Sequence, residues 1–155
     1  MPSSTTAYDN VAIGSETLHD LTTGINNVGV GRIALGDNTT GDNNTGIGYL
    51  ALRLNTTASN NTALGSSALG SNTTGGQNTA VGAGALDANT QGNYNSALGF
   101  GSLGANTTGN NNTALGYHSL KLATPASHNT SVGHASSESI TTGTNNTAVG
   151  RAALG

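Results

Sequence analysis

The stretch Asn78–Tyr94 reads Asn-Thr-Ala-Val-Gly-Ala-Gly-Ala-Leu-Asp-Ala-Asn-Thr-Gln-Gly-Asn-Tyr, and its pattern recurs every seventeen residues along the chain. The copies follow N-[TVS]-[AGS]-[VIL]-G-x-x-[AST]-L-x-x-N-T-T-G-x-N with few departures and without insertion or deletion. They begin at Asn10, Asn27, Asn44, Asn61, Asn78, Asn95, Asn112, Asn129 and Asn146. A fixed period of this length predicts a repeat architecture, in which each copy is one unit that packs on its neighbours.

Two columns of aliphatic residues emerge when the copies are aligned and their positions are numbered 1 to 17. Position 4 holds Ile13, Val30, Ile47, Leu64, Val81, Leu98, Leu115, Val132 and Val149. Position 9 holds Leu18, Leu35, Leu52, Leu69, Leu86, Leu103, Leu120 and Leu154, with Ser137 as the one exception. We interpret both columns as structural ladders that stack from coil to coil, and we expect both to contribute to the core.

The repeat favours short strands over helices, because glycines and β-branched threonines leave no window of helical length. We predict one strand at positions 1–4, a second strand from position 8 or 9 onward, and a tight corner at position 5, which is glycine in every copy. The chain lacks the Asn-Gly and Asp-Gly pairs that favour hairpins. The predicted fold is therefore all-β: a repeat solenoid, or parallel β-roll, of about nine coils.

The register extends to both ends of the chain. Residues 1–9 follow it as a partial coil with Met1 at the leucine position, and residues 10–155 form the nine-copy repeat domain, whose last copy is incomplete. Because the chain starts and stops inside a coil, we expect either a head-to-tail filament or a piece of a longer fibre. Pro125 cannot donate to a ladder, which predicts a bulge or a bend of the roll within residues 121–140.

Composition excludes several classes of function. The net charge is −3 with only four Lys and Arg, so there is no basic stripe for nucleic acid. No apolar run approaches the length of a membrane span, and no signal segment begins at Met1, so we expect no membrane insertion. The absence of cysteine excludes disulfides and thiolate metal sites, and we expect no cofactor.

The core of a single chain would be thin. Two aliphatic side chains per coil bury little apolar surface compared with the entropy lost in ordering seventeen residues. A core shared between chains would correct this imbalance. The sequence therefore predicts an oligomer.

The run Asn-Thr-Ala-Val-Gly-x-x-Ala-Leu at Asn78–Leu86, repeated with Leu for Val at Asn61–Leu69, resembles the S-V-A-I-G-x-x-S-x-A coils of trimeric autotransporter adhesin heads of the YadA type. The full seventeen-residue unit also resembles repeats of phage tail fibres and surface fibres. These resemblances imply a left-handed parallel β-roll in which three chains lie side by side around one axis. They also imply a rigid fibre segment or an adhesive head. The period here is longer than that of the adhesin-head coil, and the chain shows no neck, heptad stalk or membrane anchor.

No catalytic constellation stands out, and we expect no enzymatic activity. The four histidines occupy different repeat positions, although His118 and His134 fall in adjacent copies and can approach each other. Aromatic residues share position 6 at Tyr49, Phe100 and Tyr117. This row is a candidate surface for a cell-surface glycan or protein receptor, and it can equally pack between chains of a trimer.

Three functional hypotheses remain. The leading one is a trimeric structural fibre of a phage, a tail fibre or decoration on the virion surface, which the lack of a leader favours. The second is a bacterial surface adhesin head or a self-stacking extracellular filament. The third is an ice-binding solenoid that presents the threonine column at position 13 as a flat face.

Overall fold

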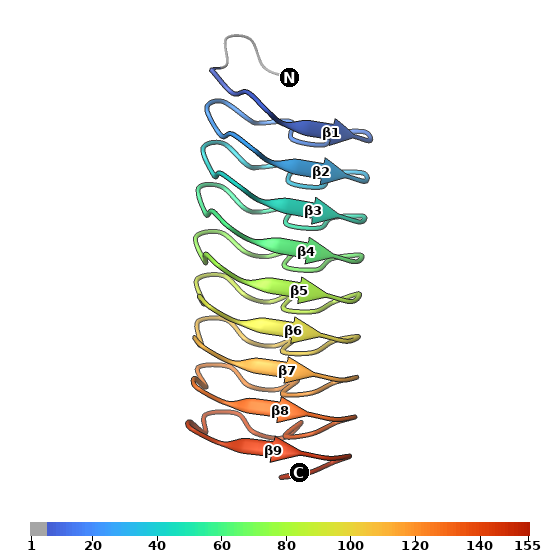
Figure 1. Ribbon diagram of the computed structural model, residues 1–155, viewed down its shortest axis with the longest axis vertical. Helices are drawn as coiled ribbons and strands as arrows, with labels where there is room; N and C mark the ends of the chain where they lie inside the picture. The colour runs from blue at the N-terminus through green and yellow to red at the C-terminus, as the bar shows by residue number, and fades with distance from the viewer. Residues whose placement is uncertain (1–5) are drawn as a thin grey trace.

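The computed structural model describes residues 6–155, which wind into a straight stack of coils (Figure 1). Each seventeen-residue copy forms one coil, and the coils are numbered 1 to 9 from the copy at Asn10 to the copy at Asn146. In Figure 1 the strands lie toward the viewer and run from left to right, the return segments pass behind them, and the chain descends with each turn. This path is a left-handed coil.

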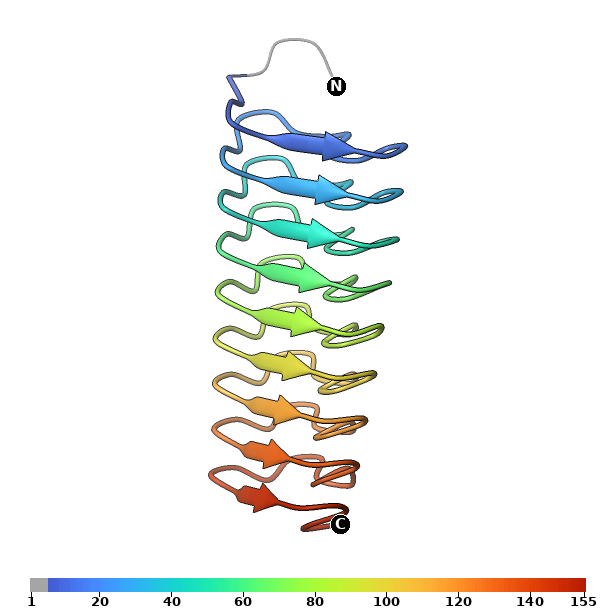
Figure 2. The same ribbon diagram turned by 45° about the vertical axis from the view of Figure 1, so that its right-hand side comes forward.

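Within residues 6–155 a parallel sheet of nine strands runs along the stack in sequence order (Figure 2). Its strands are β1 (Val11–Ile13), β2 (Val28–Val30), β3 (Thr45–Ile47), β4 (Thr62–Leu64), β5 (Thr79–Val81), β6 (Ser96–Leu98), β7 (Thr113–Leu115), β8 (Thr130–Val132) and β9 (Thr147–Val149). Neighbouring strands pair with an offset of one repeat, so that Thr62 pairs with Thr79 and Leu64 with Val81. The predicted all-β solenoid with stacked like positions is confirmed.

The corner after each strand depends on the glycine at position 5. All nine of these glycines have a φ between 127° and 140°, a region that other residues rarely adopt. A Cβ added to Gly82 would lie 2.6 Å from the carbonyl oxygen of Gly99 in the next coil. The predicted tight corner is therefore confirmed, and its cause is both the backbone angle and the close approach of successive coils.

The predicted second strand is wrong. Positions 7 and 9 adopt left-handed backbone angles, as in Gly84 (φ 66°) and Leu86 (φ 52°), and a strand cannot pass through them. The return segment instead forms successive turns. Its backbone still bonds to the next coil, since the amide of Leu86 donates to the carbonyl of Ser102 at 3.0 Å.

The predicted bulge or bend within residues 121–140 is also wrong. Strands β7 and β8 keep the common register, and the amide of Thr124 donates to the carbonyl of Thr141 at 3.0 Å. In coil 2 the amides of both Thr39 and Thr40 donate to the equivalent carbonyl. Pro125 therefore removes only the second of two amide donors to the carbonyl of Thr141, and coil 7 keeps the same path as the other coils.

Within residues 6–155 the core is a column of leucines at position 9 surrounded by small residues, with Leu21 at position 12 of coil 1 as a further buried leucine. The leucines of the column are fully buried from coil 1 to coil 7: Leu18, Leu35, Leu52, Leu69, Leu86, Leu103 and Leu120. Ser137 replaces leucine in coil 8 and is also buried, whereas Leu154 in the incomplete last coil is 55% exposed. Alanine, glycine and serine at positions 3 and 8 fill the remaining interior.

Two columns of buried asparagines complete the interior. At position 1, the amide Nδ2 of Asn78 donates to the carbonyl of Gly92, and its Oδ1 accepts from the backbone amide of Asn95. At position 12, Nδ2 of Asn89 donates to Oδ1 of Asn72 at 2.9 Å. These bonds satisfy polar groups that burial would otherwise leave unpaired, so the asparagines, which occupy position 1 in every coil and position 12 in coils 2 to 6, hold successive coils together.

Residues 6–9 carry the register upstream of coil 1. Asp9 shares the left-handed φ of 58° with Asn26 one repeat later, and the carbonyl of Tyr8 accepts from the amide of Asn26. The remainder of the predicted partial coil, residues 1–5 including Met1, lies outside the described residues. Across residues 6–155 the structure contains no helix of the length and apolarity that a membrane crossing requires.

Candidate functional site

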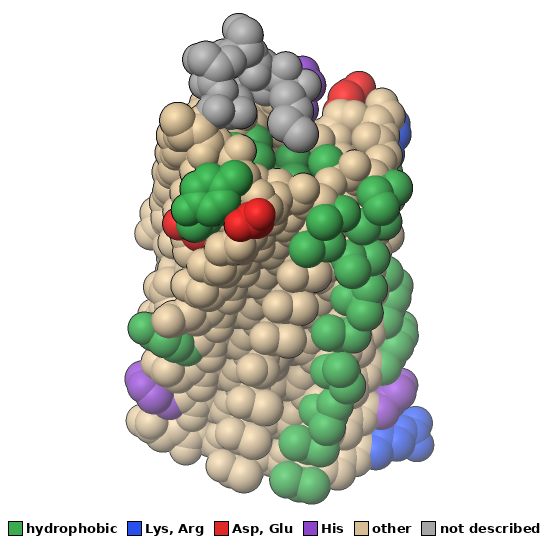
Figure 3. Space-filling model, turned by 45° about the horizontal axis from the view of Figure 1, so that its top comes forward, with side chains coloured by type: hydrophobic (Ala, Val, Ile, Leu, Met, Phe, Trp, Pro, Cys, Tyr) green, Lys and Arg blue, Asp and Glu red, His purple; other side chains and the backbone are tan. Residues whose placement is uncertain are grey.

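The strand face of the sheet exposes a column of large aliphatic side chains. These are the residues at position 4, the last residue of each strand, and they contribute to a band of hydrophobic side chains that runs along the molecule (Figure 3). The exposed fraction is 59% for Ile13, 46% for Leu64, 48% for Leu98 and 41% for Leu115. Four further members of the column are half-buried: Val30, Ile47, Val81 and Val132. The prediction that position 4 contributes to the core of one chain is therefore wrong.

Packing inside the coil explains why position 4 points outward. Side chains alternate along a strand, so position 3 points inward when position 4 points outward. A Cβ added to Gly46 at position 3 would lie 3.2 Å from Cγ of Leu35, the core leucine of the preceding coil. The space above the leucine column admits only glycine, alanine or serine. The large residue of each strand is consequently left on the surface.

A shallow groove separates the two outward-facing columns of the sheet. It lies on β5, β6 and β7, has a volume of about 300 Å³, and is lined among others by Thr79, Leu98, Thr113 and Leu115. The aliphatic column forms a ridge beside it. A ridge and a groove on one flat, apolar face are features typical of a surface that packs against another protein surface.

The threonine columns lie in two different environments. At position 13, the hydroxyl of Thr73 donates to the carbonyl of Thr90, and the same bond recurs between Thr39 and Thr56. These side chains are half-buried and committed to the backbone of the next coil. At position 2, threonines such as Thr62 and Thr113 are exposed on the strand face beside the aliphatic ridge.

The three aromatic residues of the candidate contact row at position 6 do not all lie together. The rings of Phe100 and Tyr117 stack with centroids 5.5 Å apart and planes at 12°, and the ring of His134 continues the stack 5.1 Å from Tyr117. Tyr49 lies apart from them, because Ser66 and Ala83 occupy position 6 in the two coils between. The structure thus brings together two of the three predicted residues and adds a histidine.

The histidines contribute to this aromatic cluster. The ring of His118 lies 3.9 Å from that of Tyr117, and its Nδ1 lies 3.5 Å from Oε1 of Glu138. The ammonium of Lys121 is 3.8 Å from the same carboxylate oxygen. His118 and His134 therefore both contact Tyr117. Within residues 6–155 no group of three or more His, Asp and Glu residues is placed to hold a metal ion.

A second groove, of about 550 Å³, lies beside this cluster where coils 5 to 7 turn into their return segments. Its floor consists of small residues, Gly84, Gly101 and Gly104 among them, and Phe100 forms one wall. Asp87 and Lys121 line it at the same repeat position, two coils apart. Burial raises the pKa of Asp87 above its ordinary value, and the positive charge of Arg53 opposes the rise.

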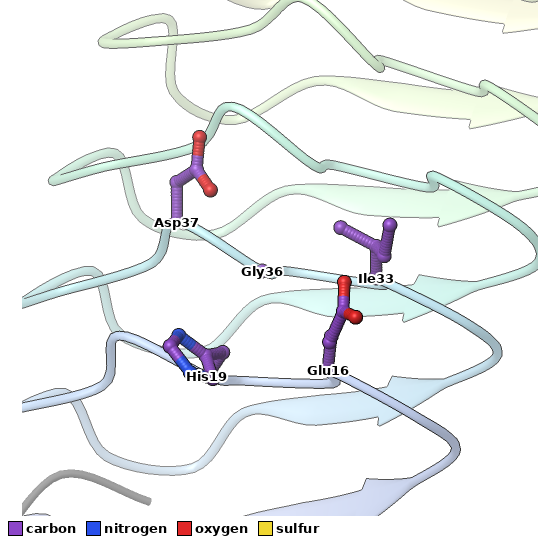
Figure 4. A pocket seen from close by; sticks show the side chains of 5 residues that line it. All are labelled: Glu16, His19, Ile33, Gly36 and Asp37. Atoms are coloured by element: carbon purple, nitrogen blue, oxygen red, sulfur yellow. The ribbon is translucent and has the colours of Figure 1, made fainter.

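A third groove, of about 210 Å³, lies at coils 1 and 2 (Figure 4). Glu16, His19 and Asp37 line it together with Ile33, but Figure 4 shows the side chain of Asp37 pointing away from those of Glu16 and His19. Nδ1 of His19 lies 2.6 Å from Oδ1 of Asp20, outside this group. The polar groups do not converge on one point.

Comparisons with protein-family models, with curated proteins and with solved structures found no match to this chain. The resemblance to trimeric adhesin heads and fibre repeats accordingly remains a prediction from the repeat motif.

Sequence reasoning missed the groove at coils 5 to 7, although a signal for it exists. The variable positions 7, 10 and 11 include a large or charged residue in coils 1 to 3, 5, 7 and 8, but they hold only small residues in coil 4 (Ser67, Gly70 and Ser71) and in coil 6 (Gly101, Gly104 and Ala105). Coil 5 has Gly84 and Ala88 at two of these positions. A local run of small residues on an outer surface of a solenoid indicates a depression there.

Proposed function

We propose that the chain is a non-enzymatic structural fibre protein in which copies of the chain pack together through their strand faces. In this proposal three copies surround one axis and form a rigid segment of a phage tail fibre or virion decoration. The observation that carries the proposal is the column of exposed aliphatic side chains at position 4. A soluble protein rarely leaves such a continuous apolar band in contact with water.

The energetics of the column support an interface. Burial of a complete aliphatic side chain contributes about 1.5–3 kcal/mol, so burial of the exposed half of each residue contributes about 1 kcal/mol. The contribution recurs in every coil because the aliphatic residue recurs. Packing between chains would thus add to each coil the second buried column that the single chain lacks.

The repeat motif is the basis for proposing three chains and a phage tail fibre or virion decoration. Trimeric adhesin heads and tail fibres, which the motif resembles, place three rolls side by side. A bacterial adhesin head or a self-stacking filament would use the same strand face, so the proposed interface is common to these alternatives.

A pair of matched variants tests the interface. Leu98→Glu places a charge in the aliphatic column, and Leu122→Glu places the same charge on the outer surface, where the leucine is 44% exposed against 48% for Leu98. A charge buried without a partner is strongly unfavourable. We expect sedimentation velocity to show Leu98→Glu as a monomer and Leu122→Glu as an oligomer of unchanged mass. Equal masses for the two variants would contradict the proposal.

A second candidate function is ice binding, and one observation favours it. Threonine at position 2, present in six of the nine coils, and aliphatic residues at position 4 form two outward-facing columns on a flat parallel sheet. Regularly spaced hydroxyl and methyl groups can order water. The column at position 13 that the sequence suggested is unsuitable, since its hydroxyls donate to the backbone.

Ice binding needs the strand face free, so it is incompatible with the trimer. It predicts a monomer whose solutions show thermal hysteresis. It further predicts that Thr113→Leu on the strand face abolishes the hysteresis, whereas Thr108→Leu, at an exposed position in a turn, leaves it intact. A trimer without hysteresis would exclude this function.

A further inference from the structure

We propose that the groove formed by coils 5 to 7 binds a saccharide, with a pyranose ring stacked on Phe100. This inference rests on the proposed role of the chain as an attachment fibre, for which it names the chemistry of the partner. The groove lies where the corners pass into the return segments, which run behind the strands in Figure 1. A partner copy on the strand face would therefore leave it accessible.

Phe100 has one ring face available. Tyr117 in the next coil stacks on one face, so the other face is directed toward coil 5. Coil 5 has only Ala83 and Gly84 at the corresponding corner, and a Cβ added to Gly84 would meet no atom within 4 Å. Phe100 is 54% exposed. It is the terminal ring of a stack, held by its neighbour, with open space in front of it.

Polar groups flank the open ring. Asp87 lies at position 10 of coil 5 and Lys121 at position 10 of coil 7, with Gly104 between them. Two coil spacings separate their backbones by about 9.6 Å. Oδ1 of Asp87 leans toward Gly70 of coil 4. The ammonium of Lys121 leans toward Glu138 of coil 8, so the two charged groups leave room between them for one sugar ring. Lys121 contacts Glu138 only at 3.8 Å, so its ammonium hydrogens remain available to a ligand.

This combination matches the chemistry of a saccharide. The C–H groups on one face of a pyranose carry partial positive charge and pack against the negative face of an aromatic ring, while hydroxyl groups at its rim need donors and acceptors. The volume of about 550 Å³ lies in the range of small-ligand sites. A nucleic acid would require more positive charge than the single Lys121 supplies.

Internal repetition provides variants that the fold accepts. Leu50 occupies the position of Gly84 two coils earlier and has a φ of 60°, against 66° for Gly84. Gly84→Leu therefore fills the groove without a new backbone conformation. Phe100→Ala removes the stacking surface, and Tyr49→Ala removes an exposed aromatic residue at the same repeat position outside the groove.

The experiment is a printed array of bacterial and eukaryotic glycans probed with the labelled full chain, followed by saturation-transfer NMR with the bound glycan. We expect the native chain to bind at least one glycan. Phe100→Ala and Gly84→Leu should each weaken binding by about tenfold or more, and Tyr49→Ala should leave it unchanged.

The native mass of every sample is measured alongside, which separates this inference from the proposed function. An oligomer that binds no glycan, or Phe100→Ala binding as the native chain does, would overturn the saccharide site alone. A monomeric native chain would overturn the proposed assembly, whatever the array shows.

Discussion

The side-chain Oδ1 of Asn106 is directed toward the coil in which Ala123 occupies the same repeat position, and it has no hydrogen-bond partner among residues 6–155. In coils 2 to 6 position 12 is asparagine, and each Oδ1 before Asn106 accepts from the amide of the next asparagine. Ala123 ends this ladder because a methyl group cannot donate. One buried acceptor is therefore left unpaired.

Ala123→Asn should extend the ladder by one step. The new Nδ2 would donate to Oδ1 of Asn106 and to the carbonyl of Ala126, as Asn55 does to Asn38 and Ala58. We expect the free energy of unfolding to rise by about 1 kcal/mol, measured by thermal or denaturant unfolding at fixed protein concentration. A lower stability would show that the interior at coil 7 cannot hold the larger side chain.

Asn72→Ala tests the ladder at its centre. Asn72 donates to Oδ1 of Asn55 and to the carbonyl of Gly75, and it accepts from Nδ2 of Asn89, so its removal deprives three buried groups of this partner. We expect a loss of about 2–4 kcal/mol in the free energy of unfolding. Thr74→Ala, an exposed change in the same turn, is the control and should cost little. Comparable losses from the two changes would refute the structural role of the ladder.

Two glycines of coil 5 should respond differently to alanine. A Cβ on Gly82 would lie 2.6 Å from the carbonyl oxygen of Gly99, at a φ of 129°. A Cβ on Gly84 would meet nothing, at a φ that leucine tolerates in Leu50. We expect Gly82→Ala to destabilise the fold by about 3 kcal/mol or more, and Gly84→Ala by about 1 kcal/mol at most. Chemical denaturation of both variants provides the measurement.

The raised pKa of Asp87 predicts a pH dependence. Burial favours the neutral carboxyl in the folded chain, with the attraction of Arg53 as the weaker, opposing cause. The folded state then binds the proton more tightly than the unfolded state, so this group favours folding below the ordinary pKa of 3.8. That contribution is lost as the pH rises through the folded-state pKa.

Asp87→Asn should consequently raise the melting temperature at neutral pH relative to the native chain, and the difference should shrink as the pH falls below 3.8. Melting curves of both proteins across this range provide the check. A variant less stable at neutral pH would indicate that the attraction of Arg53 outweighs the cost of burial.

The repeat register, the parallel stacking and the corner at position 5 could be predicted from the sequence, because stacked equivalent coils repeat the same residues at the same positions. The direction of position 4 could not. The period shows that Leu64 and Val81 are equivalent, but not whether they face the core or water. The direction depends on the space above Leu35. At Gly46, which faces Leu35 from the next coil, that space is too small for a large side chain.

The second strand was mispredicted for a related reason. Buried leucines such as Leu86 are compatible with a strand by pattern, whereas the observed φ of 52° follows from the tight turn that places the side chain inside the coil. The shared repeat position predicts the aromatic row, but it does not show which of its members are in contact. Phe100 and Tyr117 stack on each other, while Tyr49 is separated from them by two coils.

We propose above that other copies of the chain cover the aliphatic column of the strand face. Light scattering coupled to size exclusion on the purified full chain tests this claim most directly. We expect a native mass of about 46 kDa, three times the 15.2 kDa of one chain. A monodisperse species of 15.2 kDa would contradict the claim and leave the strand face free to contact water or ice.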